Sequence, residues 1–274
     1  MSNSDALPRK RFPVPLAQVR RREGAAPGAP ALLRPQGTVR QAATRHSAQG
    51  APAGLGLDSA AVRARMVQRL REAGLRDERV LAAFAAVERH RFVDTALANQ
   101  AYEDTSLPIG LGQTISKPSV VGQMLEALLH GRAPRQGLPL GRVLEIGTGC
   151  GYQAALLAQL AERVVSVERL APLAEKARTN LAEAGVDSVE VRHGDGRLGA
   201  PEWAPFDAIV SAAGGDELPA AWAEQLARGG RLVAPVGLLR PGVQQLLVCE
   251  AGPRGLVRSV VGEVYFVPLK SGAE

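Results

Sequence analysis

Strands and helices alternate between Arg142 and Pro235, and this alternation restricts the fold more than any other feature of the chain. Short runs rich in Val, Ile and Leu predict strands near 142–146, 163–167, 189–192, 206–211 and 231–235. Helical spacing fills the intervals between most of these strands, as over about 171–184 and 219–227. Such an order is typical of parallel β-α-β units, so we predict an α/β fold with a doubly wound, mostly parallel sheet.

The flanking segments have different patterns. Residues 243–249 and 256–264 predict strands without a helix between them, and hence an antiparallel C-terminal addition. Upstream, two helices are predicted, one capped by Asp58 or Ser59 and one capped by Asp77. The segment 107–118 is rich in Gly and Pro but poor in charge, which favours a loop packed against another part of the protein. Ser116 and Pro118 are expected to begin a helix that ends near His130.

The positive charge of the chain is confined to its first 57 residues. They hold nine Lys or Arg and two Asp or Glu, whereas the other 217 residues hold 24 basic and 25 acidic ones. Without apolar periodicity such a segment buries too little surface to offset its ordering entropy. We therefore predict a disordered basic tail over 1–57 and a single folded domain over 58–274. That domain divides into N-terminal helices with a substrate and cofactor loop (58–135) and an α/β core (136–274).

Composition also restricts the partners and the compartment. No apolar run reaches the roughly 18 residues that span a bilayer, so no membrane association is expected. The tail has no aromatic residues placed to stack bases, which argues against nucleic acid. Two cysteines, Cys150 and Cys249, indicate a reducing compartment, and no His lies at metal-ligand spacing from them. We expect a cytoplasmic monomer without a metal; an organellar transit peptide stays open as an alternative for the Arg-rich leader.

A glycine-rich turn follows the first predicted strand, at the position where an open α/β sheet binds ligands. It reads Glu145-Ile146-Gly147-Thr148-Gly149-Cys150-Gly151. A dinucleotide-binding turn requires Gly or Ala where this chain has Tyr152, and no Gly-Lys-Ser/Thr of a P-loop follows. An acidic residue two positions before the first Gly resembles instead the cofactor turn of S-adenosylmethionine (SAM) methyltransferases. Glu145, Gly147, Thr148, Gly149 and Gly151 are therefore candidate cofactor residues.

Two more acidic residues follow the next two strands. Glu168 ends the second strand, 21 residues after Gly147, where a carboxylate can accept hydrogen bonds from both ribose hydroxyls of an adenosine cofactor. Asp195 stands within Gly194-Asp195-Gly196 after the third strand, where an adenine amino group would be bound. The alternatives are a surface ion pair of Glu168 with Arg163 or Arg169, and a tight turn at Asp195.

These motifs resemble, in their order along the chain, the protein-L-isoaspartate (D-aspartate) O-methyltransferase family. The segment from Asp104 through Leu107-Pro108-Ile109-Gly110 to Gly112-Gln113-Thr114-Ile115-Ser116 is similar to a signature that few other methyltransferases share. The resemblance continues through the glycine turn to Arg228–Gly237 and Phe266–Leu269, and covers about three quarters of the chain. It implies a Rossmann-like SAM methyltransferase fold. The chain departs from the family pattern at Gly214 and Gly215, where Pro or another apolar residue is more usual.

The resemblance implies methyl transfer from SAM to the free carboxylate of L-isoaspartyl residues in damaged proteins, with D-aspartyl residues as an open second class. The labile ester would collapse to a succinimide and so initiate repair. Within the matching segments, Thr114, Ile115, Arg169, Gly194 and Gly196 are expected to complete the cofactor site.

A carboxylate acceptor also explains why no nucleophile–base pair stands out. A carboxylate has a pKa near 4 and is already an anion at neutral pH, while the sulfonium of the cofactor activates the methyl group. The protein must align the reacting atoms. We expect the Ser116 hydroxyl, with backbone N–H groups at a helix start, to orient the acceptor; the alternative is that Ser116 only caps the helix.

Two other functions remain open. The first is a SAM-dependent methyltransferase with a different oxygen acceptor. Base-modifying classes usually carry an Asn/Asp-Pro-Pro-Tyr/Phe motif after the fourth strand, where this chain has Ser211-Ala212-Ala213-Gly214. The second is a SAM-binding regulatory module in which the basic tail is the working part.

Overall fold

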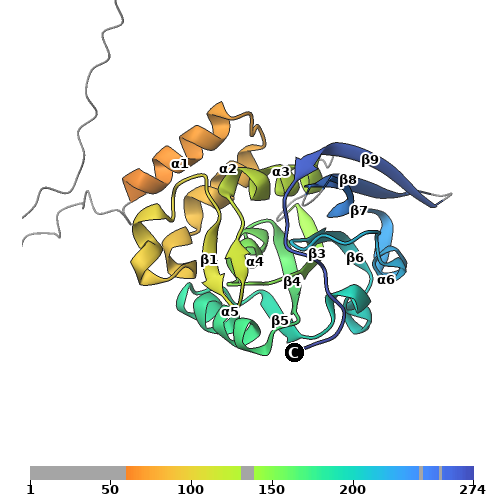
Figure 1. Cartoon of the computed structure of the whole chain (residues 1–274). Helices are drawn as coiled ribbons and strands as arrows, with labels where there is room; N and C mark the ends of the chain where they lie inside the picture. The colour runs from red at the N-terminus through yellow and green to blue at the C-terminus, as the bar shows by residue number, and fades with distance from the viewer. Residues whose placement is uncertain (1–59, 131–138, 241–242, 253–254) are drawn as a thin grey trace, which may run out of the picture. The chain divides into compact units, whose positions relative to one another are not determined.

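A seven-stranded sheet with the order β5-β4-β3-β6-β7-β8-β9 lies at the centre of the computed structural model, which describes residues 60–130, 139–240, 243–252 and 255–274 (Figure 1). Its strands are β3 (Leu140–Ile146), β4 (Ala161–Glu168), β5 (Val189–His193), β6 (Phe206–Ser211), β7 (Leu226–Arg240), β8 (Val243–Gly252) and β9 (Gly255–Val264). Neighbours from β5 to β7 pair in parallel, and β8 and β9 are antiparallel. The prediction of a doubly wound, mostly parallel sheet with an antiparallel addition is confirmed.

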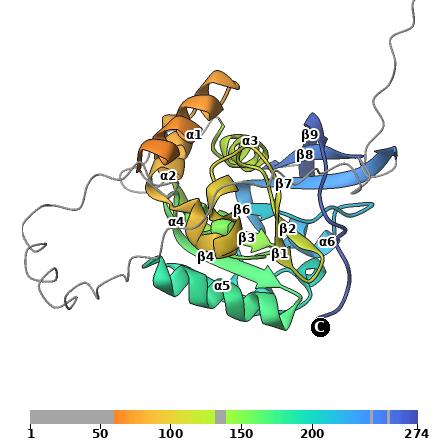
Figure 2. The same ribbon diagram turned by 60° about the vertical axis from the view of Figure 1, so that its left-hand side comes forward.

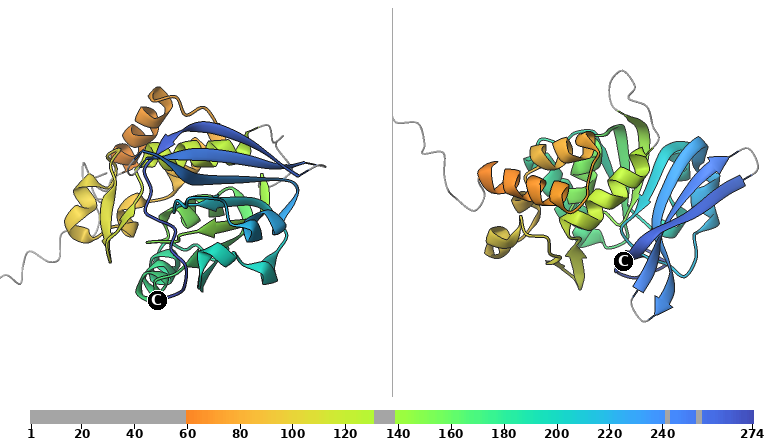
Figure 3. Two further views of the ribbon diagram at one scale, coloured as in Figure 1. Left: turned by 45° about the vertical axis from the view of Figure 1, so that its right-hand side comes forward. Right: turned by 90° about the horizontal axis from the view of Figure 1, so that it is seen from above.

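Alternate residues of each central strand enter two different hydrophobic cores. In β4, Val164 faces one core, whereas Val165 and Val167 face the other. The larger core holds α1 (Ala60–Glu72), α2 (Glu78–Ala86), α3 (Pro118–Leu129), α4 (Tyr152–Ala158) and α5 (Ala171–Glu183). The opposite core holds α6 (Ala220–Glu224) and the 3-10 turns η5 (Gly196–Leu198) and η6 (Pro201–Trp203). Helices therefore cover both faces of the sheet, as doubly wound folds require (Figures 2 and 3).

Residues 107–115 form a hairpin rather than the predicted loop. Its strands are β1 (Leu107–Gly110) and β2 (Gln113–Ile115), and the turn between them has positive φ at Gly110, Leu111 and Gly112. Leu107, Ile109 and Ile115 are buried, so the expectation of a packed segment is correct. Two short 3-10 helices, η3 (Arg89–Phe92) and η4 (Thr95–Gln100), connect α2 to this hairpin.

Several predicted helix boundaries shift or lie outside the described residues. Asp77 caps α2 as predicted, because its side chain accepts a hydrogen bond from the N–H of Arg79. The predicted tail over 1–57 and the cap at Asp58 or Ser59 lie outside the described ranges. The helix expected over about 219–227 is only Ala220–Glu224, because β7 begins at Leu226 to pair with β6. None of the helices in the described ranges has the length and apolar character that crossing a membrane requires.

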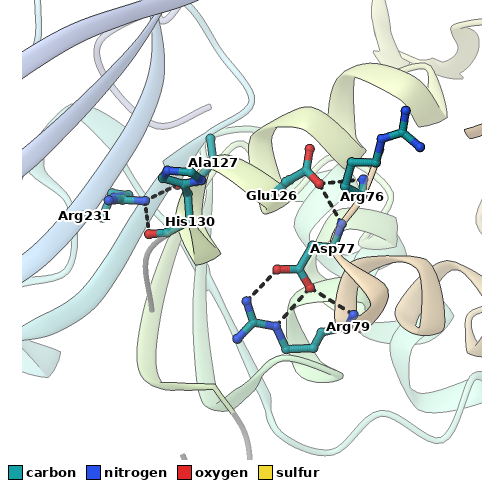
Figure 4. A network of polar contacts seen from close by, with 7 residues as sticks. All are labelled: Arg76, Asp77, Arg79, Glu126, Ala127, His130 and Arg231. Atoms are coloured by element: carbon teal, nitrogen blue, oxygen red, sulfur yellow. Dashed lines mark hydrogen bonds and ion pairs between the residues drawn. The ribbon is translucent and has the colours of Figure 1, made fainter. Parts of the chain in front are cut away.

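A polar network fixes α3 between the start of α2 and strand β7 (Figure 4). Glu126 on α3 accepts hydrogen bonds through Oε1 from the backbone N–H groups of Arg76 and Asp77, both at 2.7 Å. At the end of α3, Arg231 of β7 donates through Nη1 to the carbonyl oxygens of Ala127 and His130. These contacts satisfy backbone groups at the start of α2 and at the C-terminal end of α3, and they hold the two helices to each other and to the sheet.

We expect Glu126→Ala to lower the free energy of unfolding by about 1–2 kcal/mol, because one carboxylate bonds two backbone N–H groups that water replaces only in part. Urea denaturation measures the change. Glu103→Ala, at an exposed position, is the control and should change the free energy of unfolding little. An equal loss of stability in both variants would show that the Glu126 contacts do not stabilise the fold.

Candidate functional site

A cavity of about 370 Å³ lies at the carboxyl ends of β3 and β4. The hairpin β1–β2 forms one wall, and residues 267–270, after β9, form another. Parallel α/β sheets bind their ligands at this edge. A larger hollow of about 1070 Å³ is lined by α3 and β7 to β9, but no site residue predicted from the sequence lines it. The smaller cavity is therefore the candidate site.

Most of the predicted site residues surround this cavity. Its lining includes Thr114, Ile115, Ser116, Gly147, Thr148, Gly149, Glu168, Arg169 and Gly196. Four other predicted residues, Glu145, Gly151, Gly194 and Asp195, lie next to it without lining it. The structure thus brings together the glycine turn, the end of β4 and the hairpin, which are far apart in the sequence.

Glycine is required in the turn after β3 for conformation and for space. Gly147 and Gly149 have φ values of 87° and 57°, which L-residues rarely adopt. A Cβ on Gly149 would stand 3.1 Å from Cδ1 of Ile109 in the hairpin. Because these glycines have no side chains, the backbone of the turn is open to the cavity. A ligand can therefore approach that backbone closely.

Glu168 joins the glycine turn to the end of β4. One carboxylate oxygen accepts a hydrogen bond from the N–H of Gly149 at 2.9 Å, and the other accepts one from the N–H of Leu170 at 3.0 Å. The side chain lines the cavity, and each carboxylate oxygen can accept a second donor. The alternative of a surface ion pair does not hold in this structure, since Arg163 pairs with Glu190 and Arg169 with Glu274. Glu168 is placed to accept two hydroxyl groups of a ligand.

Glu145 lies beneath the glycine turn and is fully buried. Ser166 donates a hydrogen bond to its carboxyl group, and the Ser166 hydroxyl lies 2.6 Å from that of Thr148, which lines the cavity. Burial raises the pKa of Glu145 to about 8. The residue is therefore mainly protonated at neutral pH and is connected to the cavity through Ser166 and Thr148.

This pKa gives Glu145 a predictable effect on stability. In the unfolded chain Glu145 loses its proton near pH 4.5, but in the folded protein it keeps the proton up to about pH 8. The folded state thus binds more protons between these values, and the free energy of unfolding falls as the pH rises through this window. Gln cannot ionise. We therefore expect the free energy of unfolding of Glu145→Gln to fall less than that of the unsubstituted protein as the pH rises from 4.5 to about 8.

Thermal unfolding at a series of pH values measures the difference. Glu162→Gln, at an exposed position on β4, is the matched control and should leave the pH dependence unchanged. An unchanged pH dependence in Glu145→Gln would contradict the buried, protonated state.

The three other predicted residues outside the lining have structural roles here. Gly151, with φ at 92°, is the N-cap residue of α4. Gly194 donates its N–H to the carbonyl oxygen of Glu168 at 2.9 Å. The carboxylate of Asp195 accepts hydrogen bonds from the N–H groups of Arg197 at 2.9 Å and Gly272 at 2.7 Å, so it ties the C-terminal segment to the end of β5.

Ser116 lies between the hairpin and α3, and it is not the N-cap residue of α3. The N-cap residue of α3 is Lys117, and its side chain forms no capping bond. The start of α3 is bonded instead by Asp104, whose carboxylate accepts from the N–H and the hydroxyl of Ser119, both at 2.7 Å. Among the described residues the Ser116 hydroxyl has no assigned capping partner, and the residue lines the cavity. The hydroxyl is therefore placed to contact a ligand.

The C-terminal wall of the cavity was not predicted from the sequence. Val267, Pro268, Leu269 and Lys270 line it, although the first three belong to a segment that matched the family pattern. Gly214 holds this segment, since its N–H donates to Val267 and its carbonyl accepts from Leu269. A Pro at position 214 has no N–H to donate. The departure from the family pattern thus coincides with a backbone pairing that Pro could not make.

Comparison with known proteins gives a single consistent result. Residues 61–274 match the family model described as protein-L-isoaspartate (D-aspartate) O-methyltransferase. A protein of Methylibium petroleiphilum named protein-L-isoaspartate O-methyltransferase is 57% identical over 97% of this chain and 98% of its own length. One of the same name from Leptothrix cholodnii is 53% identical over 99% of this chain and 98% of its own length.

Solved structures agree on the fold. A structure entitled protein-L-isoaspartate O-methyltransferase is 30% identical, with a TM-score of 0.66 over 76% of this chain and 66% of its own. A Plasmodium falciparum structure, described as a complex of such an enzyme with S-adenosyl-L-homocysteine, has a TM-score of 0.64 over 75% of this chain and 97% of its own at 24% identity. At that identity the second likeness supports the fold alone.

Proposed function

Since the chain belongs to the protein-L-isoaspartate (D-aspartate) O-methyltransferase family, we propose that it transfers a methyl group from SAM to the free carboxylate of L-isoaspartyl residues in damaged proteins. The observation that carries the proposal is one cavity in which Glu168 and the glycine turn lie on the cofactor side and Ser116 lies at the hairpin. D-aspartyl residues are a second acceptor class for the same site.

The cofactor side fits an adenosine that carries no pyrophosphate. Glu168 offers oxygen atoms for the two ribose hydroxyls, and the positive-φ glycines leave room for the ligand along their backbone. Gly196, Thr114, Ile115 and Arg169 line the remaining walls. Asp195, which follows Gly194 and precedes η5, is proposed to bind the adenine amino group. Bound SAM supplies an activated methyl group. This set of residues supports SAM as the cofactor.

The acceptor side needs positioning more than proton transfer. An isoaspartyl carboxylate is ionised at neutral pH, so it requires no base. The Ser116 hydroxyl can donate one hydrogen bond to it and fix its direction toward the methyl group. Because the negative charge of the acceptor disappears as the ester forms, a single neutral donor holds the anion without stabilising it strongly against reaction.

The methyl ester is proposed to collapse to a succinimide, whose hydrolysis returns part of the chain to normal aspartate. The test is a time course with an isoaspartyl peptide and excess SAM, followed by chromatography and mass spectrometry. We expect a transient methyl ester and a growing fraction of the aspartyl peptide. A stable methylated product without any aspartyl peptide would keep the methyl transfer and reject the repair cycle.

We also propose that the chain acts as a cytoplasmic monomer, with residues 58–274 as the methyltransferase domain. Within it, residues 58–135 supply helices and the hairpin loop, and residues 136–274 form the Rossmann-like core. Two free, buried cysteines, Cys150 and Cys249, support a reducing compartment. The basic segment 1–57 is proposed to have no role in binding nucleic acid.

A further inference from the structure

Arg89, in η3, is fully buried although it carries a charge. Its pKa is lowered by burial, and among the described residues its guanidinium forms no ion pair. Its Nε and Nη1 atoms have no hydrogen-bond partner within those residues. Burying an unpaired cation is costly. Its other contacts, rather than a counter-ion, must therefore offset the free-energy cost of burying Arg89.

These contacts join the two ends of the hairpin. Nη2 of Arg89 donates to the carbonyl oxygen of Thr105 at 3.3 Å, before β1, and to that of Ser116 at 2.9 Å, after β2. The same guanidinium lies over the ring of Tyr152, with Cζ 4.8 Å from the ring centroid. Tyr152 begins α4 directly after the glycine turn. Ser116 and Tyr152 both line the cavity, whereas Arg89 lies behind its wall.

We infer that Arg89 is a positioning residue that clamps the base of the hairpin and sets Ser116 at a fixed distance from the glycine turn. The catalytic part of this inference rests on the proposed function, whereas the clamp itself does not. A second contact holds the other end of the hairpin, since Lys176 of α5 donates through Nζ to the carbonyl oxygen of Ile109 at 3.1 Å. Loss of Arg89 should therefore release the base, including Ser116, and leave the tip attached.

The test compares Arg89→Met with Arg89→Lys. Met fills a similar apolar volume but donates no hydrogen bond, whereas an ammonium group can still donate to both carbonyls. In Arg89→Met we expect amide hydrogen exchange in residues 105–116 to accelerate at least tenfold, with exchange in β3 and β4 unchanged. Turnover of an isoaspartyl peptide should fall about 100-fold, since a displacement of about 1 Å has that effect on an aligned reaction. Arg89→Lys should recover at least a tenth of the lost turnover.

Arg69→Met is the matched control, because Arg69 also donates to a carbonyl, that of Tyr102, but within the described residues it has no hydrogen bond to Thr105 or Ser116. It should leave exchange in the hairpin unchanged. Unchanged exchange and turnover in Arg89→Met would overturn the inference, and so would equally faster exchange throughout the domain. Arg89→Leu, which also donates no hydrogen bond, replaces the Met variant if that one does not fold, with the same criteria. If the unsubstituted protein methylates no isoaspartyl peptide, the proposed function fails while the exchange data still test the clamp.

Discussion

Replacing Glu168 with Gln is expected to weaken SAM binding by about 100-fold. The carboxylate of Glu168 faces the cavity while it accepts hydrogen bonds from the N–H groups of Gly149 and Leu170. A hydrogen bond to a charged group contributes about 1.5–3 kcal/mol. Gln has one acceptor oxygen, so its NH₂ group must face either a backbone N–H or a ribose hydroxyl. A net loss of about 3 kcal/mol corresponds to a factor of about 100 in the dissociation constant.

Isothermal titration calorimetry with SAM and with S-adenosyl-L-homocysteine measures the change for both ligands. The loss should be similar for the two, because they share the ribose. Glu190→Gln, a similar substitution on the neighbouring strand β5 but outside the cavity lining, is the control and should bind SAM normally. A Glu168→Gln protein that folds and binds SAM within about threefold of the unsubstituted protein would mean that Glu168 does not hold the ribose.

Replacing Ser116 with Ala is expected to lower kcat/KM for an isoaspartyl peptide by about 10–100-fold and to leave SAM affinity within about twofold. The removal of one oriented donor from an oxyanion site typically costs about 100–1000-fold in rate. The effect should be smaller here, because the charge of the acceptor decreases in the transition state rather than grows. Ser116 lines the cavity at the hairpin end and is not the cap of α3, so the substitution should change stability little.

Steady-state kinetics with a labelled methyl donor separates the two parameters. Ser259→Ala removes a hydroxyl from β9, outside the cavity lining, and should have full activity. Full turnover by Ser116→Ala would exclude the hydroxyl from the reaction and leave the backbone N–H groups at the start of α3 as the remaining candidates.

The sequence predicted the parallel strands well because their burial on both faces leaves an unmistakable apolar run. Strands β3, β4, β5 and β6 lie within three residues of their predicted bounds. The hairpin β1–β2 was missed because strands of four and three residues are too short to show alternation. Strand β7 extends past the predicted 231–235 because it pairs with β6 on one side and with β8 on the other.

The candidate site was predictable where spacing along the chain determines it. The glycine turn and Glu168 follow adjacent parallel strands, so the fold alone brings them to one edge. The wall formed by residues 267–270 could not be derived in this way, because it returns across the sheet edge from beyond β9. Arg89 gave no signal at all, since its contacts with Thr105, Ser116 and Tyr152 exist only in the folded chain.

The central claim is that the protein methylates isoaspartyl carboxylates in this cavity. Its most direct test uses two peptides that are identical except at one residue, which is isoaspartate in one peptide and normal aspartate in the other. Each is incubated with the protein and SAM labelled in its methyl group, and the base-labile label in the peptide is counted. We predict label on the isoaspartyl peptide and none above background on the aspartyl peptide. Equal label on both peptides, or label on neither while SAM still binds, would contradict the claim and leave a methyltransferase with a different acceptor.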